Sequence, residues 1–144
     1  MKTIDLETAN RLIKTAFGIA RRHGHLPITS CVVDRGGHMV SAQREDNSST
    51  FRFEIAYGKA WTCIALGHST RFVEDTMTKN RPHFVDSLAA ASNGRFIPAL
   101  GGVLIRARDD ELLGALGITG DSGENDEAVA VEAIQECGLK ADLS

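Results

Sequence analysis

The 144-residue chain has no long apolar run, no cluster of basic residues and only three cysteines. No stretch approaches the roughly 20 consecutive apolar residues that a bilayer-spanning helix requires. Lys and Arg are scattered and the formal net charge is −3, so the basic face of a nucleic-acid-binding or membrane-surface protein is not expected. The opening stretch MKTIDLETANRLIKTAF lacks the apolar core of a signal peptide. We therefore expect a cytoplasmic protein with no nucleic-acid or membrane partner.

The cysteines lie too far apart for a metal-binding pair or a disulfide framework. Cys31, Cys63 and Cys137 each have apolar neighbours, a setting in which cysteine behaves as a small hydrophobe. The chain also lacks an HExxH motif, the spacing of a calcium loop and the GxSxG turn of serine hydrolases. These absences predict no metal site and no Ser or Cys nucleophile.

The residue patterns that are present predict one domain over residues 1–144, of the α/β (α+β) class. Apolar residues recur with helical spacing in four segments, and β-branched runs bounded by turn signals mark four strands. The expected order is α-β-β-α-α-β-β-α, which predicts an antiparallel sheet flanked by helices. The helices are expected at 4–23, 48–67, 69–80 and 125–137. The strands are expected at 28–33, 38–44, 103–107 and 112–118. A long irregular segment with one short helix (86–91) is expected at 81–100.

The glycine-rich stretch GITGDSGENDEA, residues 117–128, differs from a phosphate-binding loop in its charge. Such a loop leaves a helix N-terminus free for the anion and usually supplies a Lys. Here there is no Lys or Arg, and Asp121, Glu124, Asp126 and Glu127 would repel a phosphate. We expect no nucleotide, and interpret the acidic residues as a solvated helix cap.

Four motifs in order, VVDRGGHMVSAQRED, IAYGKAWTCIALG, GRFIPALGGVLIR and LLGALGITGDSGENDEAVA, resemble the GlcG/HbpS family, also called the haem-degrading family. The resemblance covers nearly the whole chain, from about Leu6 to Gly138. It implies a profilin-like antiparallel sheet flanked by helices, and assembly into dimers to octamers. Some members bind haem; the domain also occurs attached to a cobalamin adenosyltransferase, and other members are linked to catabolism of muconate-type products. The matched positions are Asp34, Gly36, Gly37, Arg44, Lys59, Arg95, Gly101, Gly102, Asp126 and Glu127.

One hypothesis is an oligomeric protein that binds haem or a related tetrapyrrole. Haem iron needs an axial ligand, and His68 and His83 lie beside the segment 81–100. Arginine forks suit propionates, which makes Arg44, Arg95 and Arg106 candidate ligand-binding residues. Gly101 and Gly102 would let a ligand or a second chain approach the backbone closely.

The alternative hypothesis is a small deaminase- or tautomerase-like enzyme acting on an anionic, muconate-type intermediate. Lys59 and an arginine would position carboxylates while Asp34 or Glu127 transfers protons. Lys59 could instead pair structurally with Glu54 or Asp34, so whether the chain is an enzyme stays open. Under either hypothesis the aromatic residues of FRFEIAYGKAW predict burial against a second copy of the chain.

Overall fold

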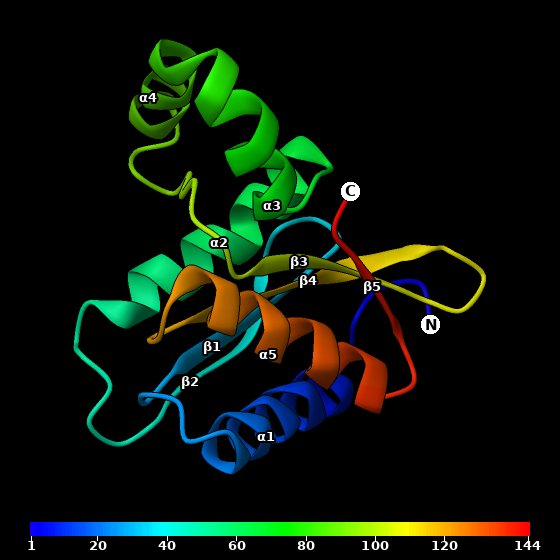
Figure 1. Ribbon diagram of the computed structural model, residues 1–144. Coiled ribbons are helices and arrows are strands. Elements are labelled where there is room, and N and C mark those ends of the chain that lie inside the picture. The colour runs from blue at the N-terminus through cyan, green and yellow to red at the C-terminus, as the bar shows by residue number, and fades with distance from the viewer.

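A five-stranded antiparallel sheet with helices on both faces forms the centre of the computed structural model, which describes residues 1–144 (Figure 1). The strands lie in the order β2-β1-β4-β3-β5, so β2 and β5 are the two edges. The elements in chain order are α1 (Leu6–Arg22), β1 (Thr29–Asp34), β2 (Met39–Arg44), α2 (Arg52–Leu66), α3 (Thr70–Phe72), a π-helical turn η1 (Val73–Thr78), α4 (Pro82–Ala91), β3 (Gly102–Arg106), β4 (Leu112–Thr119), α5 (Gly123–Glu136) and β5 (Lys140–Asp142).

The two faces of the sheet bury separate apolar layers because successive strand residues point in opposite directions. Val32 and Leu116 belong to the larger layer, which α1 and α5 cover. Their neighbours Val33 and Ala115 face α2 on the other side, in a smaller layer that includes both Cys31 and Cys63. Figure 1 shows α1 and α5 side by side below the sheet and α2 crossing above it.

The segment from α3 to α4 projects away from the sheet, beyond α2 (Figure 1). It closes over a third, small apolar cluster formed by Val73, Val85 and Phe96. The π-helical turn η1 connects α3 to α4, and α4 packs on η1 rather than on the sheet. This projecting segment leaves a hollow between α2 and α4.

The expected fold class and the order of the eight predicted elements are confirmed. Asp5 caps α1 by accepting a 2.8 Å hydrogen bond from the Thr8 amide. The short helix expected at 86–91 is present as α4, but it begins four residues earlier than expected, at Pro82. Proline is tolerated there because the first helical turn needs no N–H donor. The short strand β5 was not expected; it is three residues long and exists only through its pairing with β3.

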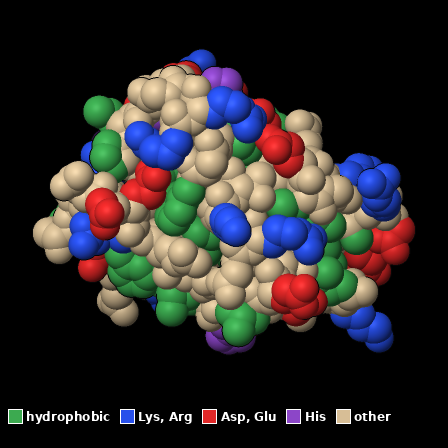
Figure 2. Space-filling view, turned by 90° about the horizontal axis from the view of Figure 1, so that it is seen from below, with side chains coloured by type: hydrophobic (Ala, Val, Ile, Leu, Met, Phe, Trp, Pro, Cys, Tyr) green, Lys and Arg blue, Asp and Glu red, His purple; other side chains and the backbone are tan.

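Acidic and basic side chains are interspersed on the face shown in Figure 2, with no continuous patch of one sign. None of the helices has the length and apolar composition needed to cross a bilayer. The exposed large apolar side chains include Phe51 and Phe53 at the start of α2, and Phe53 stacks on Tyr57 with ring centroids 6.1 Å apart.

Candidate functional site

Lys59 and Asp126 form a buried ion pair that connects the two helical layers at one end of the sheet. Lys59 lies on α2 and is 3% exposed, whereas Asp126 lies in the first turns of α5 and is 1% exposed. The Lys59 Nζ donates a 2.8 Å hydrogen bond to the Ile118 carbonyl and lies 3.5 Å from the Asp126 Oδ2. Asp126 also accepts hydrogen bonds from the amides of Gly120 and Asp121, at 3.2 and 3.0 Å.

Burial shifts both members of this pair towards their neutral forms. It lowers the pKa of Lys59, and the negative charge of Asp126 only partly offsets this effect. Burial also raises the pKa of Asp126, against the opposing influence of Lys59 and the two backbone amides. Neither residue lines any of the surface hollows, so the pair is sealed inside the protein.

The close approach predicted at Gly101 and Gly102 takes place within this chain. At Gly101, with φ of +125°, a Cβ would lie 2.9 Å from the Lys59 Nζ and would clash with the Ile118 carbonyl. At Gly102, a Cβ would lie 2.6 Å from the Lys59 carbonyl oxygen. The two glycines therefore give α2 and the Lys59 side chain the space to reach Asp126.

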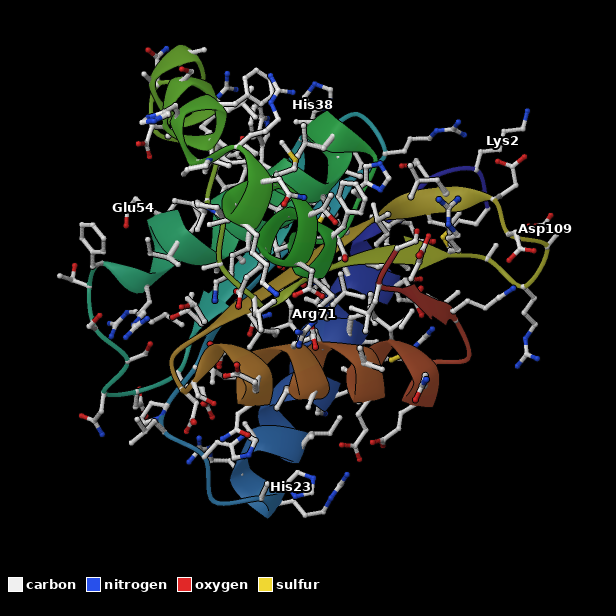
Figure 3. All side chains as sticks on the ribbon, turned by 45° about the horizontal axis from the view of Figure 1, so that its top comes forward. Lys2, His23, His38, Glu54, Arg71 and Asp109 are labelled. Atoms are coloured by element: carbon white, nitrogen blue, oxygen red, sulfur yellow. The ribbon has the colours of Figure 1, made fainter.

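Glu127, the neighbour of Asp126, forms a two-point ion pair with Arg71 near the surface. Arg71 donates from Nε and Nη2 to the two Glu127 oxygens at 3.1 and 2.9 Å. Figure 3 shows Arg71 between α3 and α5, a position from which it ties the projecting segment to the start of α5. The interpretation of the acidic stretch as a solvated cap was therefore wrong for Asp126 and Glu127, which are both buried, because helix packing supplies them with cationic partners.

Asp34 is the last residue of β1, just before the turn to β2. It lies at the opposite end of β4 from the buried pair, since it pairs with Gly114. Its Oδ1 accepts hydrogen bonds from the amides of Gly36 and His38, both at 2.9 Å. Burial opposes ionisation here, but these hydrogen bonds outweigh it and lower the pKa of Asp34. Neither Asp34 nor Glu54 is the partner of Lys59, so the pairing expected from sequence was wrong in its partner.

The three arginines expected to bind a ligand lie in different parts of the molecule. Arg44 is on the edge strand β2 and donates to the Ser48 carbonyl at 2.7 Å. Arg106 on β3 pairs with Asp142 of the opposite edge strand at 2.6 Å. Arg95 precedes β3 and stacks on Trp61, with its guanidinium carbon 4.5 Å from the ring centroid. None of these three arginine side chains lies beside Lys59.

The arginine that lies beside Lys59 is Arg52, which sequence reasoning missed. It donates to the Thr119 hydroxyl at 2.9 Å, and its charge contributes to lowering the pKa of Lys59. Its spacing of seven residues from Lys59 places both on one face of a helix and was the signal that could have identified it.

The two candidate histidines differ in their surroundings. His68, just after α2, is half-buried and stacks on Phe72 with ring centroids 3.7 Å apart. Its Nδ1 is buried without a hydrogen-bond partner. His83, in the first turn of α4, is exposed. Figure 3 shows His23 and His38 far from each other, on α1 and on the β1–β2 hairpin. No group of three or more His, Cys, Asp or Glu side chains is arranged to hold a metal ion.

The most apolar of the surface hollows lies between α2 and α4 and has a volume of about 260 Å³. Its lining consists of Trp61, Ala65, Leu66, Leu88, Ala91, Ser92, Arg95 and Phe96. A larger hollow of about 520 Å³ near Arg44 is lined mostly by polar residues, two of them acidic and two basic.

Comparison with solved structures shows that this architecture is shared with a protein described as the PduOC:heme complex, which has a TM-score of 0.85 and 25% identity. That similarity covers 97% of this chain and 99% of the other. The Klebsiella pneumoniae protein ORFY is also similar, with a TM-score of 0.82 and 25% identity over 95% of this chain and 91% of the other.

Similar sequences include an uncharacterised 15.0 kDa protein encoded between dhaT and dhaS in Citrobacter freundii, which is 27% identical over 92% of this chain and 90% of its own length. The corrinoid adenosyltransferase PduO of Salmonella typhimurium is 29% identical over 76% of this chain, but this chain spans only 32% of that protein. The family model described as haem degrading protein HbpS-like matches residues 4–135. The chain therefore belongs to the HbpS-like family.

Proposed function

We propose that this protein binds haem or a related tetrapyrrole and does so as a homo-oligomer. The observation that carries the proposal is the structural similarity to the PduOC:heme complex, which extends over 97% of the chain. The adenosyltransferase relatives add no activity to the proposal, because this chain spans only about a third of their length.

His68 offers the feature that best fits a haem ligand. Its Nδ1 is buried and has no hydrogen-bond partner, which is a costly state for a ring nitrogen unless a further group binds there. The stacking on Phe72 fixes the plane of the imidazole. Bound haem would supply an iron that accepts an axial nitrogen, and the His68 imidazole would provide that nitrogen. Arg95 and Arg44 are candidate hydrogen-bond partners for the haem propionates. His83 is the second candidate axial residue.

The apolar hollow of one copy of the chain is too small for a macrocycle. The apolar hollow measures about 260 Å³, below the roughly 300–1,000 Å³ that is typical of pockets for drug-sized ligands. The exposed Phe51 (67% exposed) and Phe53 form an apolar surface that a second copy would cover. We therefore propose that two subunits together complete the haem site.

A hemin titration followed in the Soret region tests this proposal, with free hemin and serum albumin as references. We expect a saturable spectral shift at one haem per one or two subunits, which is lost in His68→Ala or His83→Ala and kept in His38→Ala. Light scattering of the same sample should show an oligomer. A non-saturating shift equal to that of free hemin, or an unchanged shift in both histidine variants, would refute the assignment.

No observation favours the alternative hypothesis of an enzyme over haem binding. Lys59 is sealed from solvent, and the structure does not bring Asp34 and Lys59 together. Asp34 and Glu127 lie near opposite ends of β4, so they do not share one site.

A further inference from the structure

The hollow between α2 and α4 combines apolar walls with a single cationic group. Trp61 and Leu66 of α2 form one wall, whereas Leu88 of α4 and Phe96 form the other. Arg95 is the only charged residue in the lining. The hollow is therefore suited to an apolar body that carries one negative charge.

Arg95 is held by contacts that leave its charge without a partner. Its guanidinium lies over the Trp61 ring at 4.5 Å, and its Nε donates to the Ser92 carbonyl at 3.1 Å. None of the ion pairs in the structure includes Arg95, in contrast to Arg22, Arg71 and Arg106, which all have carboxylate partners. The two Nη groups remain free to donate, side by side, to an incoming carboxylate.

The backbone around Arg95 is fixed before any ligand arrives. The Phe96 amide donates to the Ser92 hydroxyl and the Ile97 amide donates to the Thr62 hydroxyl, both at 2.9 Å. The chain here also packs directly on α2 at Gly58, where a Cβ would lie 2.7 Å from the Arg95 carbonyl oxygen. A cation held in this way loses little conformational entropy when it binds an anion, which favours affinity.

From these observations we propose that the hollow binds a planar, single-ring carboxylate. The volume of about 260 Å³ accommodates one ring and is too small for a macrocycle. The ring would lie among Trp61, Leu88 and Phe96, where aromatic and aliphatic contacts remove it from water. Its carboxylate would receive two parallel hydrogen bonds from Arg95. Arg95 is also a candidate propionate partner in the proposed haem site, but binding of a single-ring carboxylate in this hollow does not depend on haem.

Trp61 is the only tryptophan of the chain, so its fluorescence reports directly on this hollow. Sodium benzoate is the probe, and uncharged benzamide is its matched control at constant ionic strength and without hemin. We expect benzoate to change the Trp61 emission in a saturable way at up to millimolar concentrations, with the same affinity measured by calorimetry. Benzamide should bind at least about tenfold more weakly than benzoate, because hydrogen bonds between charged groups contribute at least the free energy that a tenfold change in affinity requires.

Three variants separate the contributions. Arg95→Gln should weaken benzoate binding about tenfold or more and remove the preference over benzamide. Ala91→Leu should fill the hollow and abolish binding of both compounds. Arg108→Gln, in the exposed β3–β4 turn, should leave binding unchanged. Circular dichroism of each variant checks the fold.

Two results would overturn the proposal. One is the absence of any fluorescence or calorimetric response of the folded wild-type protein to benzoate. The other is equal affinity for benzoate in wild type and Arg95→Gln. The haem proposal fails by a different readout, the Soret titration, so the two outcomes can be told apart.

Discussion

Replacing Lys59 by methionine should destabilise the protein strongly, because it leaves the Asp126 carboxylate buried without a cation. Methionine has a similar length and fills the space along α2, so the change removes the charge rather than the packing. Asp126 is 1% exposed and would keep only its hydrogen bonds from the Gly120 and Asp121 amides.

The expected loss is about 3–5 kcal/mol in the free energy of unfolding, the range found when one partner of a buried ion pair is removed. The two remaining amide donors place the expectation near the lower end, at about 3 kcal/mol. Asp126→Asn should cost a similar amount, because Lys59 would then retain only the Ile118 carbonyl. The double variant should be less destabilised than the sum of the single variants, by about 1–3 kcal/mol.

Urea denaturation followed by circular dichroism measures these values at neutral pH. The matched control is Lys140→Met, which removes an exposed ion pair with Asp110 and should change the stability by at most about 1 kcal/mol. If Lys59→Met is as stable as this control, or if the two single changes are additive, the pair does not connect the layers energetically and the reasoning is refuted.

Three further predictions follow from the packing, the charges and the thiols. Gly117→Ala should destabilise the protein by about 1–3 kcal/mol in the same assay, because a Cβ would clash with the backbone of α2. Gly18→Ala on α1 has open space around it and should stabilise the protein by about 0.5–1 kcal/mol. Equal effects of the two changes would contradict this packing. Hydrogen bonds from the Leu26 and Ser122 amides lower the pKa of Asp121 from 3.8 to about 2, so its contribution to stability is complete above pH 3.8 and is lost as the pH falls through about 2. Asp121→Asn should therefore be less stable than wild type near neutral pH, and this difference in stability should disappear only below about pH 2; a constant difference would count against the shift. A thiol reagent should label at most Cys137 in the native protein and all three cysteines after unfolding, because burial raises the pKa of each of the other two to about 12.

Local patterns in the sequence were sufficient for most elements of the fold. The apolar spacing along α1, the DRGG turn and the capping residues Asp5 and Ser69 each act over a few neighbouring residues, and the structure contains all of them. The start of α4 and the whole of β5 were harder to predict. In β5 the three residues have no strand pattern of their own and pair only because β3 presents a free edge.

The fold class, the family motifs and the positions of the charged residues could be predicted from the sequence alone. The contact of Lys59 with Asp126, 67 positions further along the chain, and the unpaired state of Arg95 above Trp61 become visible only in the folded chain. An ion pair or a hollow depends on which helices pack together and how closely. That closeness is set here by the absence of a side chain at Gly101 and Gly102, a condition that has meaning only when α2 lies across the sheet.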